Sequence, residues 1–275
     1  MPTQGGLARL RKSLHNGPRG NDLPAHARRA ERVAIAVQDP QLYRLPSVAE
    51  PFSAISHLVG AAAFVVLGVL LLQRGRGNSA RMAFLGVYAA SCVLLFSMSA
   101  FFHITARGGT PNLVAERLDH GAIFVLIAGS FTPVHGLLFR GALRWGALLL
   151  VWSAAAAGVT SKAVFFASLP EWLGLSFYMV LGWLGAISGL LLWRRYGFGI
   201  VVPLLLGGLA YSAGAAADFV RWPTLVPGVI HSHEVFHVMV LIGAGLHWWF
   251  VWRFADGRTA VVAGARGAGG QAARE

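Results

Sequence analysis

The chain has 275 residues, of which 56% are hydrophobic and only 12% are charged, and its mean hydropathy is +0.60. A soluble domain carries about 25% charged residues, so the charged side chains here are too few to cover a water-facing surface. This composition excludes an ordinary soluble enzyme and a mainly disordered chain, and it predicts an integral membrane protein.

The net charge of +12 is distributed in a way that favours membranes over nucleic acid. Eight of the 23 basic residues precede Ser53, and most of the others stand in gaps between apolar runs. This placement is typical of contact with anionic head groups, so we expect membrane lipids as partners and no nucleic acid. Cys92 is the only cysteine, which excludes an internal disulfide and a cysteine-built metal site.

Three parts follow one another along the chain. Residues 1–50 are polar, basic and dotted with Gly and Pro, which predicts a mostly disordered tail. Two short pieces of this tail have helical apolar spacing, so a helix lying on the membrane surface is the alternative. Residues 51–255 form the predicted membrane domain, and residues 256–275 are a Gly- and Ala-rich segment that we expect to be a flexible tail.

Seven apolar stretches recur in the membrane domain, each near the ~20 residues that a helix needs to cross the bilayer. They lie at about 53–73, 83–104, 120–138, 144–161, 173–193, 199–218 and 233–253. Backbone groups in lipid must be satisfied within the segment, so each stretch is predicted to be a helix. The predicted fold is therefore all-α, a polytopic bundle of seven transmembrane helices.

Polar side chains inside these stretches are the candidate site, because such groups are costly in a bilayer and mark function. His103 ends the second stretch, and Ser99 lies four residues before it. Asp119 opens the third stretch. His233 and His237 open the seventh, and residues four apart stand one above the other on a helix face. Two imidazoles in that arrangement can grip one metal ion.

With seven crossings, the end of the second helix and the starts of the third and seventh face the same side of the membrane. The sequence thus predicts an intramembrane zinc site in which His103, His233 and His237 are the ligands and a water takes the fourth position, as in catalytic rather than structural zinc sites. His135 and His247 fall towards the opposite side and are excluded.

The remaining polar groups have two interpretations each. Asp119 can act as a general base on the zinc-bound water, or it can simply cap the third helix. Ser99 can orient the water or donate to an oxyanion, or it can bond back to the carbonyl of residue 95. His57, in the first turn of the first helix, belongs to the same side, but an interfacial role is equally open.

These residues stand in motifs that resemble those of the hemolysin III family, the bacterial branch of the progestin and adipoQ receptor (adiponectin receptor-like) proteins. The matching stretches run in order over about residues 50–255: SAISHLVG at 53–60, SAFFH at 99–103, LDHGAIF at 118–124, IAGSFTP at 127–133, YSAG at 211–214 and HEVFH at 233–237. The resemblance implies seven helices around a buried zinc on His103, His233 and His237. It also implies an acidic residue that contacts the zinc through water, at Asp119, and the motif serine at Ser99. The family often has Asn where this chain has Ser53, and the long basic tail departs from the bacterial pattern.

Several functions remain open at this stage. The wider superfamily includes alkaline ceramidases, which implies a zinc-dependent hydrolase acting on a lipid amide such as a ceramide-like or N-acyl lipid. The alternatives are a pore-forming, cytolytic protein, a receptor-like protein with a structural zinc, and a regulator of membrane composition. The resemblance implies a bacterial cytoplasmic membrane, and the sequence leaves the oligomeric state open.

Two arguments predict opposite orientations of the protein in the membrane. The positive-inside rule compares the arginines and lysines near the spans, and here it favours an outward-facing site. The adiponectin receptor relatives imply a site in the cytosolic half instead. Nine basic residues lie on the side opposite the site: Arg74, Arg76, Arg81, Arg140, Arg144, Arg194, Arg195, Arg253 and Arg258. Four lie on the side of the site: Arg107, Arg117, Lys162 and Arg221.

Overall fold

A computed structural model describes residues 50–105 and 107–258, all of which belong to one compact unit. The tails predicted at 1–50 and 256–275 therefore lie outside the described residues, apart from residue 50 and residues 256–258. Within the described residues the regular structure is helical. The helices are α3 (Pro51–Arg74), α4 (Ser79–Ile104), α5 (Gly109–Leu138), α6 (Gly141–Phe165), α7 (Glu171–Trp183), α8 (Gly185–Tyr196), α9 (Phe198–Phe219) and α10 (Ser232–Phe254).

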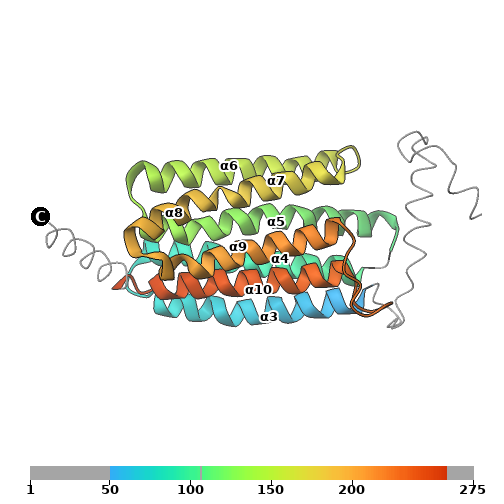
Figure 1. The fold of residues 1–275 in the computed structure, drawn as a ribbon, viewed down its shortest axis with the longest axis horizontal. Helices are drawn as coiled ribbons and strands as arrows, with labels where there is room; N and C mark the ends of the chain where they lie inside the picture. The colour runs from blue at the N-terminus through green and yellow to red at the C-terminus, as the bar shows by residue number, and fades with distance from the viewer. Residues whose placement is uncertain (1–49, 106, 259–275) are drawn as a thin grey trace, which may run out of the picture. The chain divides into compact units, whose positions relative to one another are not determined.

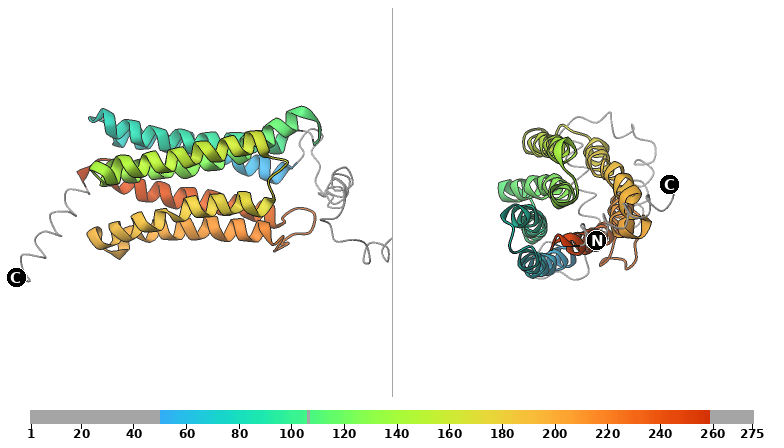
Figure 2. Two further views of the ribbon diagram at one scale, coloured as in Figure 1. Left: turned by 90° about the horizontal axis from the view of Figure 1, so that it is seen from above. Right: turned by 90° about the vertical axis from the view of Figure 1, so that its left-hand side faces the viewer.

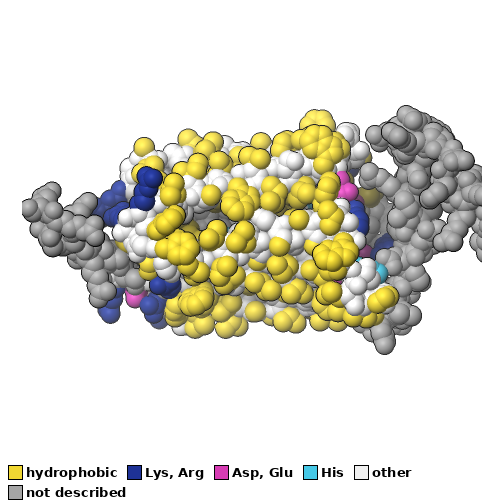
Figure 3. Space-filling model, in the orientation of Figure 1, with side chains coloured by type: hydrophobic (Ala, Val, Ile, Leu, Met, Phe, Trp, Pro, Cys, Tyr) yellow, Lys and Arg dark blue, Asp and Glu magenta, His cyan; other side chains and the backbone are white. Residues whose placement is uncertain are grey.

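Seven of the described segments are long and apolar enough to cross a membrane, which confirms the predicted fold. α7 and α8 together make the fifth of these segments, Glu171–Tyr196, and Leu184 separates them. The helices run side by side along one direction (Figure 1) and form a ring when they are viewed end-on (Figure 2). On the face shown in Figure 3, hydrophobic side chains cover the middle of the bundle and most Lys and Arg side chains gather at one end.

Two helices are longer than the apolar pattern predicts, and this corrects the positions of three charged residues. α5 begins at Gly109 rather than near residue 120, so Asp119 lies inside the helix and the N-cap interpretation is wrong. Arg117 also lies in α5, and Lys162 lies in α6, so neither is a loop residue. Hydropathy marks only the lipid-facing part of a helix, whereas a helix that ends in the head-group region continues through polar residues.

The core divides into a large cluster and a small one. The large cluster lies mainly among α3, α4, α5 and α10, includes Leu192 of α8 and Val201 of α9, and contains Tyr88, Phe96 and Phe254, each at most 1% exposed. Small residues bring these helices together: a Cβ added to Gly129 of α5 would lie 2.0 Å from Ser91 Oγ of α4. The small cluster, around Phe124, joins α5 to α6 and α7. Close backbone approach through Gly and Ser is the usual way that membrane helices associate.

The α7–α8 segment packs more loosely than the rest. Its buried residues are Gly174, Leu181, Ser188 and Leu192 alone. A hydrogen bond from Trp183 Nε1 to Ser212 Oγ, 3.0 Å long, joins α7 to α9. This segment forms one wall of the cavity that contains the candidate site.

Candidate metal centre

Three imidazoles from two helices meet at one end of the bundle. His103 ends α4, and His233 and His237 occupy successive turns at the start of α10. Nε2 of His233 lies 3.0 Å from Nε2 of His237 and 3.5 Å from Nε2 of His103. One ligand atom from each of the three lies within 4.8 Å of the others, so the three histidines can hold one metal ion. We call these three residues the histidine triad.

The donor geometry of the triad suits a cation. Zinc–nitrogen bonds of 2.0–2.1 Å in a tetrahedron separate the nitrogens by about 3.3 Å, close to the 3.0 and 3.5 Å found here. In His103 and His233, Nδ1 faces a carboxylate and must carry the proton, which leaves a lone pair on each Nε2. Lone pairs directed at one point repel each other unless a positive ion lies between them. The residues present therefore fit a metal ion.

Two carboxylates orient the triad from behind. His103 Nδ1 donates to Glu50 Oε2 at 2.5 Å, and His233 Nδ1 donates to Asp218 Oδ1 at 3.3 Å. Arg107 Nη2 also donates to Glu50 Oε1, at 2.7 Å. Burial opposes ionisation of Glu50, but the hydrogen bond from His103 and the positive charge of Arg107 favour the carboxylate and hold the pKa of Glu50 below its ordinary value. A carboxylate behind a ligating histidine fixes the ring and strengthens the ligand.

His57 is buried against the triad and is not an interfacial residue. Its ring is only 2% exposed, and its centroid lies 3.9 Å from that of His237. Its Nε2 lies 3.4 Å from the carbonyl oxygen of His237 and can donate to it. His57 thus supports the backbone of α10 at a triad residue. His135 and His247 do not join the triad, as the sequence predicts; His135 binds the Leu143 carbonyl and Ser188 at the far end of α5.

Ser99 and Asp119 line the same cavity as the triad. Ser99 is 2% exposed and forms no hydrogen bond with the described residues, so the predicted alternative of a bond to the carbonyl of residue 95 is not observed. Other hydroxyl side chains of these helices do bond to the carbonyl four residues earlier, among them Ser130, Thr132 and Ser212. Asp119 is half-buried and makes no hydrogen bond within the described part of the chain. Both side chains are therefore available to a ligand.

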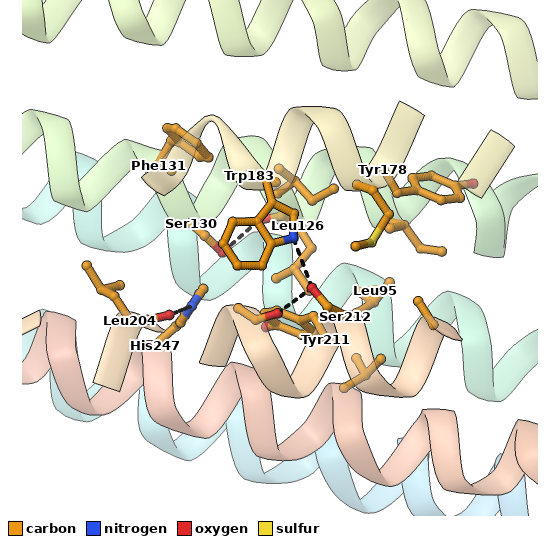
Figure 4. A pocket seen from close by; sticks show the side chains of 18 of the residues that line it. Leu95, Leu126, Ser130, Phe131, Tyr178, Trp183, Leu204, Tyr211, Ser212 and His247 are labelled. Carbon is orange, nitrogen blue, oxygen red and sulfur yellow. Dashed lines mark hydrogen bonds between the residues drawn. The ribbon is translucent and has the colours of Figure 1, made fainter. Parts of the chain in front are cut away.

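The cavity extends from the triad along the inside of the bundle and has a volume of about 560 Å³. Its wall is mainly apolar and comes chiefly from α4, α5, α7, α8, α9 and α10, with His57 of α3 and Lys162 of α6. In the part of the cavity shown in Figure 4, a hydrogen bond joins Trp183 to Ser212, Tyr211 lies beside Ser212, and His247 bonds to the carbonyl of Leu204. A cavity of this size and lining suits an acyl chain or a similarly apolar ligand.

Sequence reasoning missed Glu50 and Asp218. Glu50 was assigned to the tail because it precedes the first apolar stretch by a few residues. Asp218 stands in the last turn of α9, on the same side of the membrane as the triad, where the apolar pattern gives only the end of a span. The available signal was a carboxylate at each of two helix ends on the metal side, where histidine ligands need hydrogen-bond acceptors.

The fold and the histidine triad define a class: a polytopic integral membrane protein of seven helices with a candidate intramembrane metal centre. Comparison with known proteins then gives the family. The family model described as Haemolysin-III related matches residues 47–248, so the chain belongs to that family.

Named relatives agree with this assignment. The chain is 31% identical to Hemolysin-3 of Bacillus cereus over 70% of this chain and 86% of the relative. It is 29% identical to the Hemolysin-3 homolog of Bacillus subtilis (strain 168) over 70% and 87% of the two chains. It is also 31% identical to the Heptahelical transmembrane protein ADIPOR2 of Oryza sativa subsp. japonica over 61% of this chain and 78% of that one, which links the family to adiponectin receptor-like proteins.

Proposed function

We propose that this protein is a zinc-dependent hydrolase of the bacterial cytoplasmic membrane that cleaves the amide bond of a membrane lipid. The observation that carries the proposal is the histidine triad at one end of an apolar cavity of about 560 Å³. A lipid chain fits such a cavity, and its polar linkage then lies at the end where the triad is. The triad also leaves a fourth position for water, as catalytic zinc sites do.

His103, His233 and His237 would hold a zinc ion, which when bound would supply a water of lowered pKa and polarise a carbonyl oxygen. The protein's own groups do the rest. Asp119 accepts the proton of the attacking water and returns it to the leaving amine. Ser99 donates a hydrogen bond to the carbonyl oxygen as negative charge develops there. Glu50 and Asp218 keep Nδ1 of His103 and Nδ1 of His233 protonated, and the apolar wall excludes bulk water.

Turnover of labelled lipid amides by purified protein tests this proposal. We expect zinc-dependent release of fatty acid by the wild type and at least about a hundredfold less by Asp119→Ala, since general-base catalysis contributes 10²–10⁴-fold. His135→Ala, whose ring lies far from the triad, should keep the activity. If no member of a broad panel of ceramides and N-acyl lipids is cleaved by zinc-loaded protein, the hydrolase proposal fails.

A cytolytic function is the second candidate, because two relatives carry the name Hemolysin-3 or its homolog. Dye release from liposomes separates the two functions. Leakage that survives replacement of the whole histidine triad favours a lytic protein in which the metal only joins helices. Leakage that requires the triad together with fatty-acid release is explained by hydrolysis of the bilayer.

A further inference from the structure

A lysine that the proposed reaction does not use lines the same cavity. Lys162 lies three residues before the end of α6, on the same side of the membrane as the triad. A lysine near the end of a membrane helix usually extends its ammonium to the interface. Lys162 is instead only 8% exposed, and it is the one Lys or Arg among the described residues that line the cavity.

The surroundings of the Lys162 ammonium are aromatic and backbone groups. Nζ lies 5.2 Å from the ring centroid of Phe166 and 5.8 Å from that of Tyr178. Tyr178 is fixed in place because its hydroxyl donates to the carbonyl of His120 at 3.0 Å. On the α7 side, Gly174 leaves the space: a Cβ added there would lie 2.6 Å from Nζ.

No carboxylate within the described residues lies at ion-pair distance from Lys162. The acidic groups whose charge reaches it are Glu116 and Glu171. Glu171 is already paired with Arg221, at 3.1 Å. Asp119 also lines the cavity but forms no ion pair with Lys162. A buried ammonium without an anion is costly, and intramembrane charges are usually paired or functional.

We propose that Lys162 binds the anionic head group, a phosphate or carboxylate, of an amphiphile whose apolar part fills the cavity. Phe166 and Tyr178 flank the ammonium, and Lys162 lines the cavity that would hold the ligand. This inference rests on the proposed function, and it narrows the substrate to anionic N-acyl lipids rather than neutral ceramides. The place of Lys162 near the end of α6 supports it, because the ends of a helix that spans the bilayer lie near the lipid head groups.

Equilibrium binding to the purified full-length protein tests the inference without requiring turnover. The probes are a fluorescent N-acyl phosphatidylethanolamine, which is anionic, and a neutral ceramide with the same acyl label. Lys162→Met should weaken binding of the anionic lipid by about 10–100-fold, the value of one hydrogen bond to a charged group. Binding of the ceramide should stay within about threefold, and Lys162→Arg should keep most of the affinity for the anionic lipid.

Two further variants guard against a general defect. Gly174→Ala keeps the lysine but displaces its ammonium. It should therefore weaken binding of the anionic lipid but not of the ceramide, and by less than Lys162→Met does. Arg76→Gln removes one positive charge at the exposed opposite end of the bundle and should change the binding of neither lipid. Metal content and melting temperature, measured on each variant, show that the bundle remains folded.

The outcomes distinguish the sources of the anion and the two proposals. Displacement of the labelled lipid by a short-chain anionic lipid, but not by millimolar inorganic phosphate, supports a lipid head group. Displacement by inorganic phosphate alone assigns the site to a soluble anion and overturns the lipid inference. If Lys162→Met weakens binding of both lipids equally, or weakens binding of neither, the lipid inference is also overturned. Selective binding of the anionic lipid without any release of fatty acid supports the inference about Lys162 and contradicts the hydrolase proposal.

Discussion

The third and fifth membrane segments of this protein are packed in opposite ways. In α5, 67% of the most apolar window is buried inside the bundle, whereas in the α7–α8 segment only 17% is buried. The helices that pack on α5 and close the large core, α4 and α10, hold the histidine triad. The α7–α8 segment instead forms a wall of the cavity. A metal site needs ligands held to within a fraction of an ångström, whereas a lipid site needs a wall that can adapt.

The largest expected effect is the loss of bound zinc when a triad ligand is removed. His237→Ala should reduce the zinc content of the purified protein from about one ion per chain to near zero, because two imidazoles alone do not make a closed site. Metal analysis beside wild type gives the answer. His247→Ala, in the same helix and outside the triad, is the matched control. Full zinc content in His237→Ala would contradict the assignment of the ligands.

Removal of a supporting carboxylate should have a smaller but clear effect. Glu50→Gln keeps the shape of the side chain but loses the charge behind His103, so zinc affinity should fall by about 10–100-fold. Competition with a zinc chelator measures the affinity. Asp218→Asn should act in the same way through His233, and Glu171→Gln, whose carboxylate faces Arg221 instead, should leave the affinity unchanged.

A methyl group added at a helix crossing compares the two regions directly. Gly129→Ala places Cβ against Ser91 and should destabilise the bundle by about 1–3 kcal/mol, as overpacking does. Gly182→Ala, in α7, has no atom within 4 Å of the new Cβ and should change stability by less than about 0.5 kcal/mol. Unfolding in detergent measures both. Equal effects would mean that the α7 segment is as tightly packed as α5.

The smallest effect is expected for the hydrogen bond between α7 and α9. Trp183→Phe removes the donor to Ser212 and should cost about 0.6 kcal/mol, the average for such bonds between membrane helices. Hydrogen exchange of α7 should become faster while that of α5 does not change. Trp193→Phe, in α8, is the control because its indole makes no hydrogen bond within the described residues. A large loss of stability in Trp183→Phe would show that this wall is rigid.

The sequence alone was sufficient for the seven spans and for the histidine triad. Hydropathy over about 20 residues is a strong signal, and the even or odd number of crossings places His103 with His233 and His237 on one side. The start of α5 at Gly109 was missed because the first turns of that helix are polar. The apolar pattern leaves Lys162 in a loop because the predicted stretch ends at residue 161, whereas α6 continues to Phe165. The approach of Gly174 of α7 to Lys162 depends on helix packing, which spacing along the chain does not show. The cavity depends on which helices pack loosely, and spacing along the chain does not contain that information.

The link between Glu50 and His103 has a practical consequence. The carboxylate that supports a metal ligand from the second span comes from the residue just before the first span. Trimming of the N-terminal segment for expression must therefore stop before residue 50. A deletion that starts the chain at Pro51 would remove a support of the metal centre, and weak zinc loading in such a shortened protein would then be a result of the deletion rather than a property of the native chain.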